Sequence, residues 1–252
     1  MPDAHYINPK LSEIYDFDSG WSVDRDFYLS LADSARQSIL DLGCGTGLLC
    51  NAYAEKGHDV TGVDPSAAML DVARRKPNGK NIEWVESVAQ TFHSDKRFDL
   101  IIMTGHAFQV LLEDADVLST FSVIAKHLKA SGIAVFESRN PAIDWANRWD
   151  YELELKLPDQ TVRESRRFLA MRGDRMTFEL RYQFPDETLL SSSELRFQSR
   201  NEIEEKLSDS DLLVEKLLGD WDGRPFDDET SEEMIFVTRA KPIQQGISQD
   251  PL

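Results

Sequence analysis

The sequence predicts an α/β protein: a doubly wound parallel sheet into which a smaller antiparallel β cap is inserted. Over residues 26–137, short apolar runs alternate with segments whose apolar residues recur at helical spacing. Between residues 138 and 200 the period changes to two, which is typical of antiparallel strands. The 252 residues, 41% of them hydrophobic, suffice to bury one core with one elaboration.

The elements of the sheet follow in a regular order. We expect helices over residues 26–36, 48–56, 66–75 and 114–129, and strands over residues 39–42, 59–63, 82–85, 99–103 and 133–137. Such alternation favours parallel strands covered by helices on both faces. Near the end of the chain, a helix over residues 201–208 and strands over residues 213–218 and 234–238 complete the pattern.

The inserted segment predicts four antiparallel strands. Residues 175–184 alternate without error, with Met176, Phe178, Leu180, Tyr182 and Phe184 on one side. Residues 151–157, 163–171 and 194–198 alternate as well, and Gly173-Asp174 and Pro185-Asp186 supply turns. We therefore divide the chain into a main domain (residues 1–137 and 200–240), a β cap (residues 138–199) and a tail (residues 241–252) that we expect to be disordered.

The segment ILDLGCGTG, residues 39–47, indicates a site for a nucleoside cofactor. Three glycines in five residues let the backbone turn sharply and approach a ligand. A dinucleotide fingerprint would need a small residue where Leu48 stands, and a P-loop would need a basic residue, absent from residues 37–55. S-adenosylmethionine, whose methionine part is cationic, fits beside Asp41, although that carboxylate could equally only brace the loop.

The second strand ends in another carboxylate, Asp64, followed by Pro65. At the carboxyl end of such a strand, a carboxylate can accept hydrogen bonds from both ribose hydroxyls. The competing role is that of helix N-cap, with Pro65 as the first helical residue. We favour the ribose role for Asp64.

These motifs resemble those of class I S-adenosylmethionine-dependent methyltransferases of the small-molecule type. The resemblance rests on ILDLGCGTG, on VTGVDPSAAML (residues 60–70), on FDLIIMTG (residues 98–105) and on HLKASGIAVFES (residues 127–138), and it covers about the central hundred residues. It implies a Rossmann-like, seven-stranded sheet whose last strand is antiparallel. It also implies a set of cofactor-binding residues: Asp41, Gly43, Cys44, Gly45, Asp64, Pro65, Met69, Ser87, Val88 and Thr104.

Within that set, the resemblance places the glycine loop against the methionine part, and Pro65 and Met69 against one face of the adenine. One departure concerns the adenine edge. The family usually has an acidic and then a small residue after the third strand, where this chain has Glu86, Ser87 and Val88. Either Glu86 serves with a shifted register, or Ser87 accepts the hydrogen bond.

Methyl transfer requires a nucleophile held in line with the methyl group and little covalent chemistry from the protein. We expect a small acceptor with a nitrogen or oxygen nucleophile. His106, in the loop after the fourth strand, is the candidate base, and Tyr15 is expected near the methyl group. Both residues could instead be structural. Trp21, Phe108, Gln109 and Asn140 are candidates for lining the acceptor site, although helix packing explains them as well.

Composition limits the partners. A net charge of -17 disfavours nucleic acid, and the basic residues grouped at residues 163–175 fit a solvated strand face better than an anion site. We expect no membrane segment, no metal site, two reduced cysteines and a cytoplasmic location. A homodimer through the cap is possible. Two alternative functions stay open: a regulatory protein that binds S-adenosylmethionine without turnover, and another enzyme on this scaffold, a nicotinamide-dependent oxidoreductase or an aminopropyl transferase.

Overall fold

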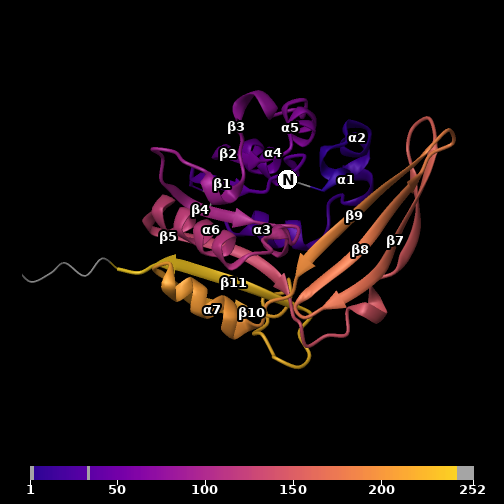
Figure 1. The fold of residues 1–252 in the computed structure, drawn as a ribbon. Coiled ribbons are helices and arrows are strands. Elements are labelled where there is room, and N and C mark those ends of the chain that lie inside the picture. Colours follow the sequence, from indigo (N-terminus) through magenta and orange to yellow (C-terminus); the bar gives the residue numbers. More distant parts are fainter. Residues whose placement is uncertain (1–2, 33–34, 243–252) are drawn as a thin grey trace, which may run out of the picture.

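A seven-stranded sheet forms the centre of the larger part of the protein (Figure 1). The computed structural model describes residues 3–32 and 35–242. The strand order is β10-β11-β5-β4-β1-β2-β3. The strands are β1 (Ser38–Leu42), β2 (Asp59–Asp64), β3 (Glu83–Glu86), β4 (Phe98–Met103), β5 (Leu128–Arg139), β10 (Leu212–Leu218) and β11 (Glu233–Ala240). β1 to β5 are parallel, and β11 is antiparallel to both β5 and β10. This confirms the predicted sheet and its antiparallel last strand.

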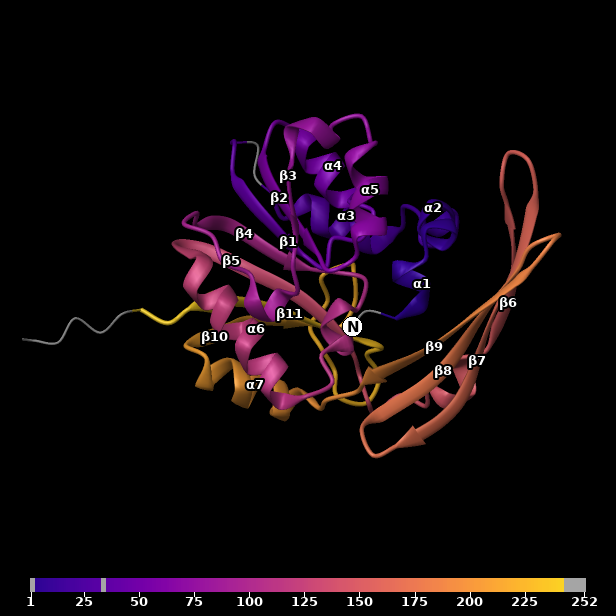
Figure 2. The ribbon, with the colours of Figure 1, turned by 45° about the horizontal axis from the view of Figure 1, so that its top comes forward.

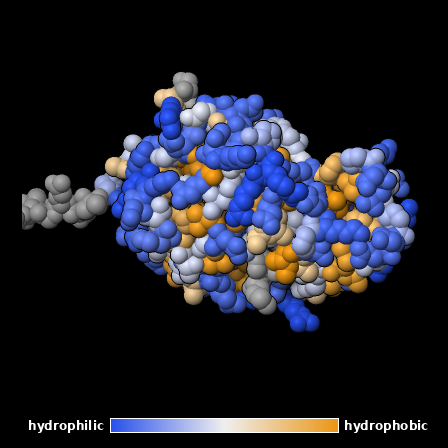
Figure 3. Space-filling view, turned by 90° about the horizontal axis from the view of Figure 1, so that it is seen from above, coloured by the Kyte–Doolittle hydropathy of each residue, from blue (hydrophilic) through white to orange (hydrophobic). Residues whose placement is uncertain are grey.

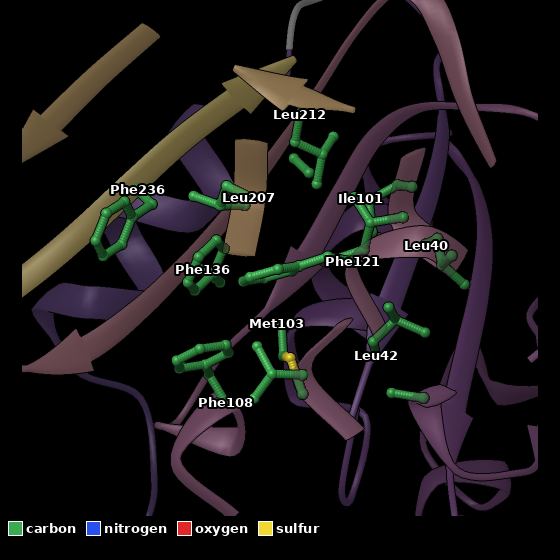
Figure 4. Close-up of a cluster of buried hydrophobic side chains, with 14 of the residues drawn as sticks. Leu40, Leu42, Ile101, Met103, Phe108, Phe121, Phe136, Leu207, Leu212 and Phe236 are labelled. Carbon is green, nitrogen blue, oxygen red and sulfur yellow. The ribbon is translucent and has the colours of Figure 1, made fainter. Parts of the chain in front are cut away.

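Apolar residues alternate along the strands and form a core on each face of this sheet. On one face, Leu40 and Leu42 pack with Phe121 of α6 (Asp114–His127) and Leu207 of α7 (Arg200–Asp209), as Figure 4 shows. On the other face, Ile39 packs with residues of α3 (Val23–Ser30) and α4 (Leu48–Glu55). α3 precedes β1, α4 follows the glycine loop, and α5 (Ala67–Arg74) follows β2. A capping box of Ser199 and Glu202 begins α7.

A separate antiparallel sheet in the order β6-β7-β8-β9 forms the cap. Its strands are β6 (Tyr151–Lys156), β7 (Thr161–Arg172), β8 (Arg175–Gln183) and β9 (Thr188–Arg196). The alternation predicted for residues 176–184 is confirmed, because all five apolar side chains of that series are buried. The prediction for the last strand was wrong: β9 begins at Thr188 and ends at Arg196, where the sequence suggested residues 194–198. The inward positions Ser191 and Ser193 are polar, so no apolar pattern marks them.

Two helices that the sequence analysis did not predict lie between the main sheet and the cap (Figures 1 and 2). These are α1 (Ala4–Ile7) and α2 (Pro9–Asp18). Leu11 and Ile14 of α2 belong to the apolar core of the cap, and the hydroxyl of Ser66 at α5 donates to the Tyr6 carbonyl at 2.6 Å. The N-terminal segment therefore ties the cap to the end of β2.

Helix boundaries differ from the predicted ones mainly at α3. Residues 26–36 were predicted as a helix, but α3 spans Val23–Ser30. Residues 33 and 34 lie outside the described residues, as do residues 243–252 of the predicted tail. Within that tail, the Lys241 amide donates to the Asp211 carbonyl at 2.8 Å. Four short 3₁₀ turns, η1 (Gly79–Asn81), η2 (Ala89–Thr91), η3 (Ala107–Val110) and η4 (Ala146–Arg148), complete the described elements.

The surface seen in Figure 3 is mostly hydrophilic, with separate hydrophobic areas. Charged residues make up 29% of the whole chain, which accounts for much of this polar surface. Among the helices of the described segments, none combines the length and apolar character needed to cross a bilayer.

Candidate functional site

The glycine loop after β1 places its three glycines in the left-handed region, at φ of 80°, 54° and 70° for Gly43, Gly45 and Gly47. The amides of Gly43 and Cys44 donate to the Val63 carbonyl at 2.8 and 3.0 Å, which fixes the loop to β2. A Cβ on Gly45 would meet nothing within 4 Å, whereas one on Gly47 would lie 2.4 Å from the Trp84 ring. The loop thus faces open space at Gly45 and is closed by packing at Gly47.

Asp64, at the end of β2, holds the same loop from its side. Its Oδ2 accepts the Gly45 amide at 2.9 Å and its Oδ1 accepts the Ser66 amide at 2.8 Å. Burial raises the pKa of Asp64, while the two amide hydrogen bonds act against that rise. The suggested N-cap role for this residue was wrong, because the N-cap of α5 is Ser66, whose hydroxyl accepts the Met69 amide. Each oxygen of the Asp64 carboxylate retains a second lone pair for a further donor.

Asp41 lies beneath the loop and is only 2% exposed. The thiol of Cys50 donates to its Oδ2 at 3.4 Å, and its Oδ1 has no hydrogen-bond partner in the part of the chain that the structure describes. Burial raises the pKa of Asp41 to about 7, and the charge of Arg25 opposes this rise. A buried acceptor without a donor is costly, so this oxygen is suited to a cationic or hydrogen-bond-donating ligand.

The residues expected around the adenine lie beside Asp64. The Ser87 amide donates to the Asp64 carbonyl at 3.2 Å, so the turn after β3 adjoins the end of β2. Pro65 is half-buried, Met69 is buried in α5, and Val88 is exposed. The Ser87 hydroxyl donates to the Val88 carbonyl at 3.1 Å, and Glu86 is exposed at the end of β3.

His106 follows β4 and has an unusual backbone, with φ of 60° next to Thr104 and Gly105. Its amide donates to Glu137 Oε1 at 2.6 Å, and its Nε2 lies 3.0 Å from Glu233 Oε2. Burial lowers the pKa of His106 to about 3, so the imidazole is neutral at physiological pH and is a weak base. This geometry fits a residue that shapes the loop better than a general base.

Tyr15 of α2 belongs to the same neighbourhood as the cofactor residues. Its ring centroid lies 6.3 Å from that of Tyr6, and the charge of Asp64 acts on the phenols of both tyrosines, whose pKa values are raised mainly by burial. Trp21 does not join them: it is 46% exposed, and its indole N–H donates to Asp26 Oδ1 at 2.8 Å. The two tyrosines of the N-terminal segment thus lie near Asp64, and its tryptophan lies on the surface.

The residues expected to line the acceptor site have packing roles in this structure. Phe108 is buried in the core, with its ring 5.6 Å from Phe121 and 4.8 Å from Phe136 (Figure 4), so it is unavailable to an acceptor. Asn140 is buried, and its amide nitrogen donates to the carbonyls of Asp228 and Ser231.

Gln109 has a positioning role instead. It is buried, its side-chain nitrogen donates to the Arg196 carbonyl at 3.0 Å, and its Oε1 accepts from Arg139 Nη1 at 2.9 Å. Arg139 ends β5, next to the expected site, and the sequence analysis did not single it out.

A second group that the sequence analysis missed lies on the inner face of β7. Glu164 is buried; the Tyr151 hydroxyl donates to its Oε1, and its Oε2 has no hydrogen-bond partner among the described residues. Burial raises the pKa of Glu164 to about 7. Arg166, two positions further along, donates to the Trp149 carbonyl at 2.9 Å. The sequence contained a signal for both residues: Glu164 and Arg166 lie two and four positions after the buried Val162, so they are on the same face of the strand.

The same strand explains the basic cluster at residues 163–175. Arg163 and Arg167 point outward, are largely exposed, and pair with Glu154 and Glu152 of β6. The prediction of a solvated strand face is correct for Arg163 and Arg167 and wrong for Arg166, which lies on the inner face.

Comparison with known proteins agrees with this architecture. Residues 39–132 match the family described as "Methyltransferase domain". The cypemycin N-terminal methyltransferase of Streptomyces is 35% identical over 106 residues, 42% of this chain and 43% of that protein. A ubiquinone biosynthesis O-methyltransferase of Rickettsia conorii is 28% identical over 120 residues, 47% of this chain and 40% of that protein. This chain thus spans less than half the length of the curated relatives that it matches.

Solved structures match over nearly the whole chain at low identity. A S-adenosylmethionine-dependent methyltransferase from Clostridium acetobutylicum superposes with a TM-score of 0.78 at 18% identity, covering 92% of this chain and 98% of that one. The sugar N-methyltransferase KedS8 from Streptoalloteichus gives a TM-score of 0.73 at 20% identity, covering 89% of this chain and 91% of that one. These matches extend the shared fold through the cap.

Proposed function

We propose, on the premise that residues 39–132 form a methyltransferase domain, that this chain transfers the methyl group of S-adenosylmethionine to a nitrogen or oxygen of a small acceptor. The observation that carries the proposal is the open side of the glycine loop at Gly45, bounded by the carboxylates of Asp41 and Asp64. The bound cofactor supplies an activated methyl group on a sulfonium, displaced in line by the acceptor.

The residues fit such a cofactor in charge and in hydrogen bonding. Asp64 accepts both ribose hydroxyls on its remaining lone pairs, and the Asp41 carboxylate attracts the ammonium of the methionine part. Arg25, whose charge acts on Asp41 and on Tyr15, is suited to the methionine carboxylate. Gly43, Cys44 and Gly45 lie along the methionine part with Thr104 nearby; Pro65, Met69, Ser87 and Val88 surround the adenine.

Tyr15 lies near the cofactor residues and the inner face of the cap, because the charge of Asp64 acts on its phenol and Tyr15 itself acts on Tyr182 of β8. We place it beside the methyl group, where its ring excludes water and orients the acceptor. Proton acceptance, where the acceptor requires it, falls to Glu164, since its pKa of about 7 and its unpartnered Oε2 suit a general base better than His106 does.

Calorimetric titration of the protein with S-adenosylmethionine, S-adenosylhomocysteine and NAD tests the proposal. We expect saturable binding of the first two ligands and none of NAD. Binding of NAD alone would refute the proposal in favour of the oxidoreductase. The names of the relatives described above favour transfer over regulatory binding, and methylated product from a panel of amines and alcohols distinguishes the two.

The location and assembly of the protein are also proposals. Two free thiols, Cys44 and Cys50, suit a reducing compartment such as the cytoplasm. Leu169, Met171 and Leu190 are exposed on the cap, which is compatible with a homodimer through that sheet. Light scattering of the purified protein measures its molecular mass in solution and so tests the homodimer.

A further inference from the structure

Two arginines at the junction of the main sheet and the cap have no carboxylate partner. Arg139 ends β5 and Arg166 lies on the inner face of β7, and neither forms an ion pair within 4.0 Å among residues 3–32 and 35–242. Their hydrogen bonds go to neutral oxygens, those of the Gln109 side chain and the Trp149 backbone. In a chain with a net charge of -17, two half-buried cations without counter-charge contacts need an explanation.

The acidic residues that act on these arginines are bonded to other donors. Glu137 accepts from the His106 amide and the Tyr28 hydroxyl, and Glu233 contacts the His106 ring. On the cap side, Glu164 accepts from Tyr151, and Asp18 accepts from the Ser19 hydroxyl. Neither guanidinium group therefore has a carboxylate in hydrogen-bond contact, although the Glu164 Oε2 beside Arg166 remains without a partner among the described residues.

Both guanidinium groups lie against the indole of Trp149. The distance from Cζ to the ring centroid is 5.0 Å for Arg139 and 4.1 Å for Arg166. Trp149 is 1% exposed, yet its indole N–H has no hydrogen-bond partner within the described residues. A buried donor of this kind costs free energy unless a ligand or water accepts from it. Two guanidinium groups and a buried indole N–H from three segments thus lie together, and none of the three has a charged acceptor among the described residues.

We propose that Arg139, Arg166 and Trp149 form a receptor for an oxyanion, the carboxylate or phosphate group of the methyl acceptor. Planar guanidinium groups bind such oxyanions through paired hydrogen bonds, and an indole N–H adds a third direction. Gln109 positions Arg139 by accepting from its Nη1. This inference rests on the proposed function, and it names the class of acceptor: a small molecule with a fixed negative group.

The receptor lies on the acceptor side of the site. The charges of Arg139 and Asp64 both act on the phenol of Tyr6, and Tyr6 and Tyr15 are ring neighbours at 6.3 Å. The tyrosines thus lie between the oxyanion receptor and the cofactor residues. An acceptor anchored through its anionic end would present its other end toward the tyrosines and the methyl group. Glu164 lies beside the receptor, because its charge acts on Arg166.

Direct anion binding tests the receptor. The wild-type protein, saturated with S-adenosylhomocysteine, is titrated with acetate and, separately, with inorganic phosphate, by calorimetry and by NMR of its five tryptophan indole N–H groups. We expect saturable binding of one anion and a downfield shift of one indole resonance, because Trp149 then becomes a hydrogen-bond donor. The anion that binds distinguishes a carboxylate from a phosphate acceptor. No saturable binding of either anion overturns the proposal.

Variants localise the effect. Arg139→Gln and Arg166→Gln are each expected to weaken anion binding ~10-fold or more and to reduce the indole shift, because each removes a charge-assisted contact. Arg163→Gln, on the outward face of the same strand as Arg166, is the matched control and should bind as the wild type does. Equal anion affinity in Arg166→Gln and Arg163→Gln overturns the proposal, and so does an indole shift that survives in both inward variants.

The two proposals fail separately. Affinity for S-adenosylhomocysteine, measured without added anion, reports on the proposed function and also shows that each variant is folded. Wild-type protein that binds the nucleoside and neither anion refutes the oxyanion receptor alone. The anion titration is therefore repeated without the nucleoside: protein that then binds an anion through Arg166, and that binds no nucleoside, refutes the methyltransferase proposal alone.

Discussion

Gly45 and Gly47 have the same kind of backbone conformation, but the structure predicts opposite consequences for their replacement by alanine. At both positions, φ lies in the left-handed region, which costs an alanine about 1–2 kcal/mol. At Gly47 the new Cβ would also lie 2.4 Å from the Trp84 ring, an overlap that costs about 1–3 kcal/mol more. At Gly45 it would meet nothing within 4 Å. We therefore expect Gly47→Ala to unfold at lower urea concentration than Gly45→Ala.

Cofactor affinity should follow the reverse order. The Cβ of Gly45→Ala enters the space assigned to the methionine part, so we expect a ~10-fold or greater loss of S-adenosylhomocysteine affinity. The folded fraction of Gly47→Ala should keep an affinity close to that of the wild type. Urea unfolding followed by circular dichroism and fluorescence gives the stabilities, and calorimetry gives the affinities.

A double variant provides the control. Adding Trp84→Leu to Gly47→Ala should recover part of the loss, since the two side chains compete for one volume, and the coupling between them should be about 1–3 kcal/mol. Two results would refute the argument: equal free energies of unfolding for Gly45→Ala and Gly47→Ala, or wild-type nucleoside affinity in Gly45→Ala. The first contradicts the packing of Trp84, and the second contradicts the position of the cofactor.

Three further predictions concern carboxylates. Asp64→Ala should bind S-adenosylhomocysteine ~10-fold or more weakly than the wild type. It should also lose about 1–3 kcal/mol of stability, because two backbone amides lose their acceptor. Unchanged affinity in calorimetry would show that Asp64 does not bind the ribose. Burial raises the pKa of Asp41 from 3.8 to about 7, so the free energy of unfolding of the wild type falls as the pH rises between those values. At pH 8 the free energy of unfolding of Asp41→Asn should therefore exceed that of the wild type by up to roughly 4 kcal/mol. Near pH 4, urea unfolding should show no such gain. Glu164→Gln should abolish the rise of kcat/KM as the pH passes about 7, and an unaltered pH profile would exclude Glu164 as the base.

The main sheet could be predicted from the sequence because its strands are buried on both faces, and because each of the helices that cover it buries one face. Apolar residues at those positions make the period visible without any tertiary information. The same reasoning failed for β9, where inward Ser191 and Ser193 bond to the N-terminal segment: the His5 amide donates to Ser191 Oγ at 3.1 Å, and the Ser193 hydroxyl donates to Asp3. A strand that buries polar groups against a distant segment has no apolar alternation to reveal it.

The start of helix α2 is marked in the sequence by Asn8 and Pro9, and this signal was missed in the sequence analysis. Asn8 accepts from the amides of Lys10 and Leu11, and Pro9 stands at the first helical position, so Asn-Pro marks the start of a helix. The packing of α2 against the cap could not be predicted, because Leu11 and Ile14 lie far in sequence from the strands that they contact. The charge of Asp64 acts on the phenol of Tyr15, and the role expected for Tyr15 beside the methyl group stays a prediction. The exposure of Trp21 depends on where that helix ends.

The glycine loop was predictable and the acceptor side was not, for a physical reason. The cofactor residues follow strand ends within one stretch, and parallel strands bring such ends to one edge of the sheet. The acceptor side that we propose combines α2, the end of β5 and the inner face of β7. There Glu164 and Arg166 occupy positions that an apolar residue would fill at lower cost. Charges at inward positions of an otherwise apolar strand therefore indicate binding or catalysis. Applied to β7, that criterion selects Glu164 and Arg166 and leaves out Arg163 and Arg167, which is the division that the anion titrations and the pH profile would measure.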